Sequence, residues 1–178
     1  KRFDIAAEYM IGRILDRRAA HANPKSGQYY GPHNIEEYIA KGIYVYMRDP
    51  QEGTKAEWLK KAFGNILTPL IRAIDPEWAG TEGDWAVQIN VINSAKQSIN
   101  RHVDEHDIAP QYGLALGDFE GGELTIWSQD ESSQQSIDLR NRIVRLDGRN
   151  YHQVVPVTSG TRYSVYFFKN YDHRWLEV

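Results

Sequence analysis

Short apolar runs separated by turn residues fill the second half of the chain and constrain its fold more than any other feature. Runs this short and this closely spaced are typical of antiparallel strands. The pairs Gly121–Gly122 and Asp147–Gly148 mark turns between them. The sequence therefore predicts an all-β barrel or a jelly roll of two sheets in this half. The runs are Trp85–Ile92, Tyr112–Leu116, Glu123–Trp127, Arg142–Leu146, Val154–Val157 and Tyr163–Phe168.

The first half of the chain has the periodicity of helices. Apolar residues recur at spacings of three and four from Phe3 to Ile14 and again from Leu59 to Ile74, as on one face of an amphipathic helix. Pro69 predicts a kink or a new turn in the second of these helices. A capping box predicts a short helix over residues 34–41, and the β-branched and aromatic run Ile43–Met47 predicts a strand.

Length and pattern together favour one α+β domain with a mainly β core. The 178 residues suit a single domain, and we found neither an internal repeat nor a linker. We expect a helical support region over residues 1–83 and a β core over residues 84–178. Residues 1–76 hold 12 basic and 9 acidic side chains, whereas residues 77–178 hold 9 basic and 15 acidic ones.

Composition excludes several classes of protein and site. The chain has no cysteine, which rules out disulfide scaffolds, thiolate zinc sites and cysteine nucleophiles, so any metal must be held by nitrogen and oxygen. The net charge of −3 lacks the basic excess of many nucleic-acid binders. No apolar run is long enough to span a membrane, and the first residues do not resemble a signal peptide. We expect a monomer without membrane attachment that is not secreted: a cytoplasmic or nuclear protein, or a viral or phage protein in the host cytoplasm.

One set of polar residues has the pattern of a metal site. His102 and Asp104 lie two positions apart on an extended segment, so both side chains can face one ion. His152 follows fifty residues after His102, beside another short strand. Two imidazoles and one carboxylate form the facial triad that suits non-haem Fe(II). Arg162 begins the last strand ten residues later, where its guanidinium can grip a carboxylate with help from Ser164.

This order of residues resembles the Fe(II)/2-oxoglutarate dioxygenases, from about Asp84 to Lys169. The resemblance implies a double-stranded β-helix, another name for the jelly roll. It also implies that His102, Asp104 and His152 bind Fe(II) and form the catalytic centre. Arg162 and Ser164 would hold the far carboxylate of 2-oxoglutarate. Such an enzyme would use O₂ to convert 2-oxoglutarate to succinate and CO₂ while it hydroxylates a substrate C–H bond. On the strand before the triad, Asn90 is either a further co-substrate contact or a plain polar residue of the sheet.

The substrate is a separate question. The spacing of the motif, with Asp107 three residues after Asp104, is similar to TET/JBP-like 5-methylpyrimidine dioxygenases, in some of which a carboxylate at this offset contacts the flipped base. This resemblance favours the methyl group of 5-methylcytosine, or of thymine, in DNA. Tyr29 and Tyr30 could stack a base, and Arg149 could contact a phosphate. Packed loop residues are the alternative for the two tyrosines.

Alternatives remain open at the level of the sequence. The segment Gly121-Gly-Glu-Leu124 is equally familiar from prolyl-hydroxylase-like enzymes, which act on a protein side chain. Prolyl-hydroxylase-like enzymes usually carry Lys where this chain has Arg162. A small metabolite is a further possible substrate. A non-catalytic jelly-roll binding module is the alternative outside enzymes. Four arginines lie close together in the sequence: Arg140, Arg142, Arg145 and Arg149. They form either a phosphate-binding patch or a charged edge strand. On a strand, Arg140 and Arg142 would share one face.

Overall fold

The computed structural model describes residues 43–47, 52, 55–80, 85–93 and 98–170. The chain divides into two compact units, Lys1–Val91 and Ile92–Val178. The helices expected over residues 3–14 and 34–41, and the tyrosines at positions 29 and 30, lie outside the described residues. The expected single domain, with its regions 1–83 and 84–178, stays a prediction.

The first unit contains a strand pair and a long helix. Strand β1 (Ile43–Tyr46) pairs antiparallel with β2 (Ala86–Asn93), which runs across the boundary between the units. Helix α3 (Lys55–Ile74) buries Phe63, Leu67 and Ile71, which lie four residues apart and therefore on one face. Pro69 lies inside this helix, so the helix continues past it. The short helix α4 (Pro76–Ala79) begins at Asp75, whose side chain accepts a hydrogen bond from the backbone N–H of Trp78.

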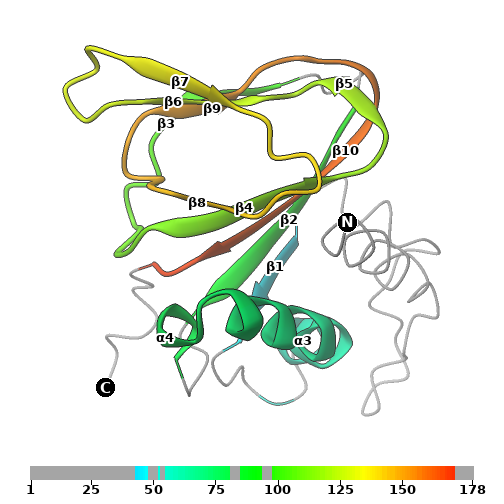
Figure 1. The fold of residues 1–178 in the computed structure, drawn as a ribbon. Coiled ribbons are helices and arrows are strands. Elements are labelled where there is room, and N and C mark those ends of the chain that lie inside the picture. Colours follow the sequence, from blue (N-terminus) through cyan, green and yellow to red (C-terminus); the bar gives the residue numbers. More distant parts are fainter. Residues whose placement is uncertain (1–42, 48–51, 53–54, 81–84, 94–97, 171–178) are drawn as a thin grey trace. The chain divides into compact units, whose positions relative to one another are not determined.

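The second unit is built from two antiparallel sheets that face each other (Figure 1). In the first sheet, β10, β4 and β8 are neighbours in this order, and β5 pairs with β10. In the second, the order is β3-β9-β6-β7. The strands are β3 (Ile99–His102), β4 (Gln111–Leu116), β5 (Phe119–Gly121), β6 (Leu124–Trp127), β7 (Gln134–Ile137), β8 (Val144–Leu146), β9 (His152–Val154) and β10 (Val157–Phe168).

Apolar side chains from both sheets of this unit meet in one core. The buried cluster draws members from β4, β5, β6, β8, β9 and β10, so it fills the space between the sheets. It consists of Ile92, Ala115, Phe119, Leu124, Leu139, Leu146, Val154, Val157 and Tyr166. Two packed antiparallel sheets with few helices confirm the predicted jelly-roll core of an α+β chain. Among the described helices, none is both long and apolar enough to cross a membrane.

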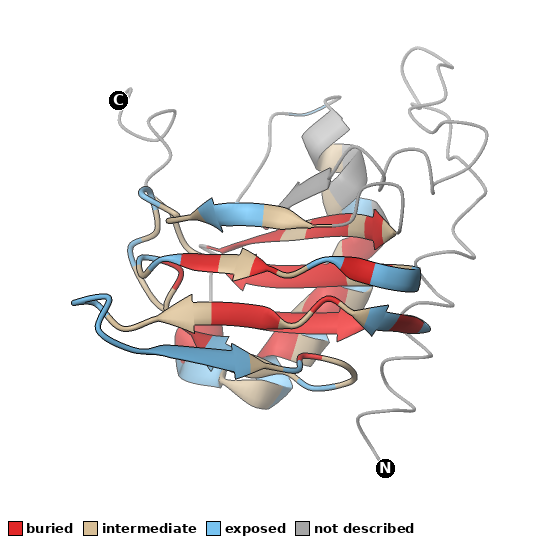
Figure 2. Ribbon diagram, turned by 90° about the horizontal axis from the view of Figure 1, so that it is seen from above, coloured by how far each residue is buried: buried red, intermediate tan, exposed pale blue. Residues whose placement is uncertain are grey.

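The strand predictions hold for the longer apolar runs but omit the short strands β3 and β5. Strand β7 was not predicted, because Gln134, Gln135 and Ser136 are exposed at the edge of their sheet and carry no apolar alternation (Figure 2). The expected run Val154–Val157 contains the end of β9 and the start of β10, because the chain changes sheets there.

Candidate active site

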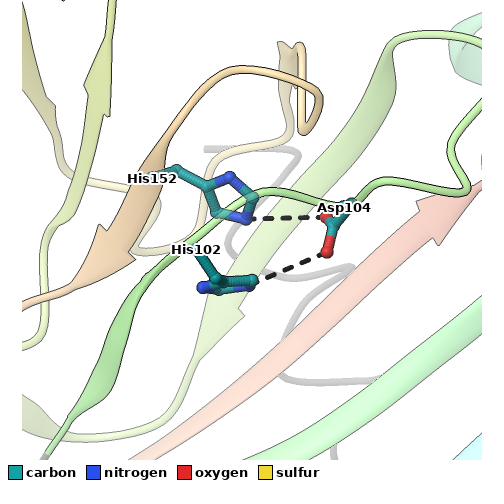
Figure 3. Close-up of side chains that lie close together, drawn as sticks. All are labelled: His102, Asp104 and His152. Carbon is teal, nitrogen blue, oxygen red and sulfur yellow. Dashed lines mark ion pairs between the residues drawn. The ribbon is translucent and has the colours of Figure 1, made fainter.

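Two paired strands bring the predicted metal ligands together. In the antiparallel pair of β3 and β9, His102 lies opposite His152, and their ring centroids are 4.3 Å apart. Asp104 follows just beyond the end of β3 and turns its carboxylate toward both imidazoles (Figure 3). Its Oδ1 lies 3.7 Å from Nε2 of His102, and its Oδ2 lies 3.5 Å from Nε2 of His152. One donor atom from each residue lies within 4.8 Å of the other two, a geometry that could hold one metal ion.

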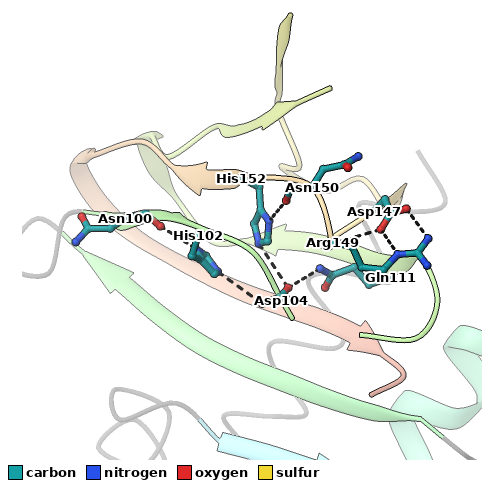
Figure 4. A network of polar contacts seen from close by, with 8 residues as sticks. All are labelled: Asn100, His102, Asp104, Gln111, Asp147, Arg149, Asn150 and His152. Atoms are coloured by element: carbon teal, nitrogen blue, oxygen red, sulfur yellow. Dashed lines mark hydrogen bonds and ion pairs between the residues drawn. The ribbon is translucent and has the colours of Figure 1, made fainter. Parts of the chain in front are cut away.

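Backbone carbonyls orient both imidazoles in the same way. Nδ1 of His102 lies 2.7 Å from the carbonyl oxygen of Asn100, and Nδ1 of His152 lies 2.9 Å from that of Asn150 (Figure 4). A carbonyl can only accept, so each Nδ1 carries the proton, and in the neutral imidazole the lone pair is on Nε2. Both Nε2 atoms point to Asp104, which is the arrangement that a metal ligand set requires. Burial lowers the pKa of His152, which favours this neutral form.

A side-chain amide fixes the carboxylate of the triad. Gln111, buried on β4, donates from Nε2 to Oδ2 of Asp104 at 2.8 Å (Figure 4). The backbone N–H of Asp104 donates to the carbonyl oxygen of Gly148 at 2.8 Å. A Cβ atom at Gly148 would lie 1.9 Å from Nε2 of Gln111 and 2.7 Å from Oδ2 of Asp104. Only a residue without a side chain therefore leaves room for the bond between Gln111 and Asp104.

Arg162 is the largest fully buried side chain of the described residues. Its Nη1 donates to Oγ of Ser164, which is also fully buried, whereas its Nε and Nη2 have no hydrogen-bond partner. The side chain lies against Gly122, where a Cβ atom would come within 2.9 Å of Cδ of Arg162. A buried guanidinium with two unpartnered nitrogens fits an anionic ligand such as a carboxylate, which takes two parallel N–H bonds.

Asp107 lies beside the triad and is electrostatically unusual. Its backbone N–H donates to the carbonyl oxygen of Asp104, and its Oδ2 is buried without a hydrogen-bond partner. Burial, and then the negative charges of Asp104 and Asp147, raise the pKa of Asp107 to about 7, against a smaller opposing effect of Arg149. A carboxyl group of this kind can donate as well as accept a hydrogen bond near neutral pH.

Of the other predicted site residues, the structure describes Arg149 and Asn90. Arg149 is exposed and forms a bidentate pair with Asp147, with Nε–Oδ1 and Nη2–Oδ2 distances of 2.7 Å each. This pair raises the pKa of Arg149 and lowers that of Asp147. Asn90 is buried on β2, in the first unit. Tyr29 and Tyr30 lie outside the described residues.

The expectation that Arg140 and Arg142 share one face of a strand is wrong. Strand β8 begins only at Val144, and Arg140 lies before it in an isolated bridge with Ala115. Asn141 between the two arginines has φ of 54°, a left-handed conformation that breaks the alternation of an extended strand. The guanidinium of Arg140 lies 4.5 Å from the ring centroid of Phe119. The two side chains therefore do not form a continuous strand face for phosphate contacts.

Sequence reasoning missed Gln111 and Gly148. Both lie near the triad only because β4 pairs with β8, with Gln111 opposite Leu146, and because the loop after β8 turns back. The Asp-Gly pair was recognised as a turn, and that turn is present, since the N–H of Asn150 donates to the carbonyl of Asp147. A polar first residue in the otherwise apolar stretch Gln111–Leu116 was the available signal for Gln111.

Residues 87–170 match the family model of the 2OG-Fe(II) oxygenase superfamily. The match covers just under half of the chain and includes the triad, Arg162 and Ser164. The donor set is right for Fe(II), because two imidazoles and a carboxylate leave positions open for the co-substrate and O₂. The jelly roll and this donor set fit a non-haem iron oxygenase. Residues 87–170 are therefore similar to the 2OG-Fe(II) oxygenase superfamily, and the chain is a dioxygenase that uses Fe(II), 2-oxoglutarate and O₂.

Several solved structures are distantly similar. A Pseudomonas putida prolyl-4-hydroxylase is 16% identical, with a TM-score of 0.48 over 96% of this chain and 83% of that one. NgTET1 in complex with 5mC DNA is 17% identical, with a TM-score of 0.45 over 75% of this chain and 64% of that one. A Trichoplax adhaerens prolyl hydroxylase, in complex with a hypoxia inducible factor peptide, is 14% identical, with a TM-score of 0.48 over 100% and 83%. No curated protein matches the sequence. Likenesses this distant indicate nothing about the substrate.

Proposed function

We propose that His102, Asp104 and His152 hold the Fe(II) of this dioxygenase and that Arg162, with Ser164, holds the far carboxylate of 2-oxoglutarate. The convergence of three donor atoms within 4.8 Å supports the first assignment. When bound, Fe(II) and 2-oxoglutarate together activate O₂ to oxidise a C–H bond, with succinate and CO₂ as co-products. The protein contributes orientation: the carbonyls of Asn100 and Asn150 direct the imidazoles, and Gln111 directs the carboxylate.

The buried guanidinium is the observation that carries the co-substrate assignment. An arginine side chain is charged at every physiological pH, and removing one partner of a buried ion pair costs about 3–5 kcal/mol. Arg162 has zero exposure, and its Nε and Nη2 lack partners. A carboxylate bound there would remove this cost with two charge-assisted hydrogen bonds. The site therefore favours an anionic co-substrate over a neutral one.

Binding measurements test these two assignments separately. Mn(II) can replace iron in calorimetric titrations, so that no turnover occurs. Arg162→Ala should weaken 2-oxoglutarate binding by about 100-fold while Mn(II) binding stays within about twofold, since a charged bidentate contact is lost and the triad is not. The double variant His102→Ala/Asp104→Ala should lose Mn(II) binding. Arg142→Ala, an exposed arginine of the same unit, is the matched control. Unchanged 2-oxoglutarate affinity in Arg162→Ala would assign the co-substrate contact to another residue.

For the substrate we propose the methyl group of 5-methylcytosine, or of thymine, in DNA. The similarity of the motif spacing to TET/JBP-like dioxygenases supports this choice. So does Asp107, because its Oδ2 is a buried oxygen without a partner, close to the metal ligands. With a pKa of about 7, this carboxyl group could hydrogen-bond either a donor or an acceptor on a flipped base. Stacking on Tyr29 and Tyr30 and a phosphate contact from Arg149 belong to the same proposal.

Succinate formation tests the substrate. The purified protein with Fe(II), ascorbate and 2-oxoglutarate is given DNA with 5-methylcytosine, the same DNA unmethylated, or a proline-rich peptide. We expect the methylated DNA to stimulate succinate release and to gain oxygen, and His102→Ala/Asp104→Ala to abolish both. Stimulation by the peptide alone would replace the DNA proposal with a prolyl-hydroxylase-like one, which the Gly121-Gly-Glu-Leu124 segment favours. Asp107→Ala should lower the rate with methylated DNA more than the uncoupled turnover without DNA.

A further inference from the structure

One face of β10 carries a row of polar side chains. Because side chains alternate along a strand, Arg162, Ser164 and Tyr166 point to the same side of the sheet. Their partners on β4 confirm the register, since Ser164 lies opposite Ala115 and Tyr166 opposite Gly113. Tyr166 and Ala115 both belong to the core cluster between the two sheets of this unit. The row therefore faces the interior between the two sheets, as do the proposed co-substrate contacts Arg162 and Ser164.

Tyr166 is buried, yet its hydroxyl has no hydrogen-bond partner. The residue is 8% exposed, and its oxygen is one of the few buried side-chain atoms of the described residues that lack a partner. Gly113 makes room for the ring, since a Cβ atom there would lie 2.7 Å from Cε1 of Tyr166 and 3.0 Å from Cδ2 of Leu146. The aromatic ring is thus packed in place, while its polar end is left unsatisfied. A buried hydroxyl in this state is costly unless something binds it.

The position of Tyr166 places it between the two halves of the proposed site. Gln111 and Gly113 are two residues apart on β4, so the side chain of Gln111 shares the face of Tyr166 and is its diagonal neighbour. Gln111 donates to the metal-binding carboxylate of Asp104, and Arg162 lies four residues before Tyr166 on β10. The row accordingly runs from Asp104 through Gln111, Tyr166 and Ser164 to Arg162. Within this row, Tyr166 and Arg162 have hydrogen-bond donors without a partner.

We propose that the hydroxyl of Tyr166 donates a hydrogen bond to 2-oxoglutarate bound between the triad and Arg162. This inference rests on the proposed role of Arg162. Tyr166 lies in this row between Gln111, which contacts Asp104, and Arg162. A molecule that reaches from the triad to the guanidinium of Arg162 would therefore pass the hydroxyl of Tyr166. The co-substrate offers carboxylate and keto oxygens, all acceptors, and so supplies the partner that the protein does not. Tyr166 is a further co-substrate contact, in addition to Arg162 and Ser164.

The variant Tyr166→Phe tests this contact, because it removes the hydroxyl and keeps the ring. In calorimetric titrations with Mn(II) in place of iron, Tyr166→Phe should weaken 2-oxoglutarate binding by about 10-fold or more, the loss of a hydrogen bond to a charged group. Its Mn(II) affinity should not change. The melting temperature of the ligand-free protein should stay equal or rise, because an unsatisfied buried polar atom is removed. A merely structural tyrosine would behave in the opposite way, with lower stability and unchanged affinity.

Tyr163→Phe is the matched control. Tyr163 lies on the same strand, three residues earlier and on the opposite face, so its loss of a hydroxyl should leave 2-oxoglutarate affinity unchanged. Equal affinities of Tyr166→Phe and the wild type would overturn the inference about Tyr166. If the wild type itself bound no 2-oxoglutarate, or if Arg162→Ala bound it as well as the wild type, the proposed co-substrate site would fail instead. The two failures are therefore distinguishable.

Discussion

Two glycines near the candidate site act by leaving space for neighbouring side chains. Gly148 is not one of the proposed metal ligands, yet its missing side chain permits the hydrogen bond from Gln111 to Asp104. Metal ligands usually depend on such supporting contacts, whose loss typically lowers metal affinity by about 10- to 100-fold. Gly113 leaves comparable space for the ring of Tyr166.

Substitution of Gly148 should therefore weaken metal binding. We expect Gly148→Ala to reduce Mn(II) affinity by about 10-fold or more, because its Cβ would displace the Gln111 amide from Asp104. Gln111→Leu should show a similar loss. Gly64→Ala is the control: its Cβ would meet only Sδ of Met47, at 3.8 Å, and alanine in a helix is favoured over glycine by up to about 1 kcal/mol. Full Mn(II) affinity in Gly148→Ala, measured by titration, would contradict the supporting role.

Asp107 should make the stability of the metal-free protein depend on pH. Its pKa is raised from 3.8 to about 7 in the folded state, so between these values the folded protein binds the proton more tightly than the unfolded one. This contribution to stability is fully present below about pH 4 and is lost as pH rises through 7. Asp107→Asn should remove this part of the pH dependence in urea unfolding between pH 5 and about 8. An unchanged pH dependence of stability in Asp107→Asn would contradict this contribution.

At the scale of elements, β3 needs support from outside its own ladder. Its pairing with β9 joins Ile99 to Val154 and His102 to His152, with an irregularity between the two pairs. Side-chain contacts on the outer face of the sheet compensate for this interrupted pairing. The guanidinium of Arg101 lies 4.6 Å from the ring centroid of Trp127 and 4.2 Å from that of Tyr151, and it also pairs with Glu131. These side chains connect β3 to β6 and to the residue before β9, beside His102 and His152.

Arg101→Ala should therefore lower the free energy of unfolding. Two cation–π contacts at partly exposed sites contribute about 0.5–1 kcal/mol each, so we expect a loss of about 1–2 kcal/mol in urea unfolding. Arg101→Lys should recover part of this loss, because lysine keeps the charge without the planar stacking surface. Arg142→Ala, also an exposed arginine, should change stability by less than about 0.5 kcal/mol. Equal effects of the two alanine variants would show that the stacking contributes nothing.

At the scale of the whole molecule, ligand binding and folding are coupled. A ligand that binds only the folded state at 100 times its dissociation constant stabilises that state by about 2.7 kcal/mol. For a chain of 178 residues this corresponds to a rise in melting temperature of about 5–10 °C. We expect such a rise when Mn(II) and 2-oxoglutarate are added together. Thermal melts of His102→Ala/Asp104→Ala should show no rise, and a rise of equal size in that variant would place the binding elsewhere.

The sequence predicted the members of the site better than their surroundings. Order and spacing predicted His102, Asp104, His152, Arg162 and Ser164 as site residues, because a facial triad needs specific residue types near strand ends. The structure brings the first three together. The longer strands with apolar side chains were recognised by their composition. The polar strand β7 was missed because its exposed residues leave no hydrophobic pattern.

What the sequence determined by itself was the chemistry: a donor set of nitrogen and oxygen, a guanidinium ten residues beyond, and enough short strands for a jelly roll. What only the tertiary structure decided was the environment of these groups. The register of β4 against β10 and β8 places Gln111 beside Asp104 and Tyr166 beside Gly113, and packing of the two sheets removes Arg162 from water. Ligand types follow from local residue identity, whereas burial, register and unpartnered hydrogen-bond donors follow from contacts between segments far apart in the chain.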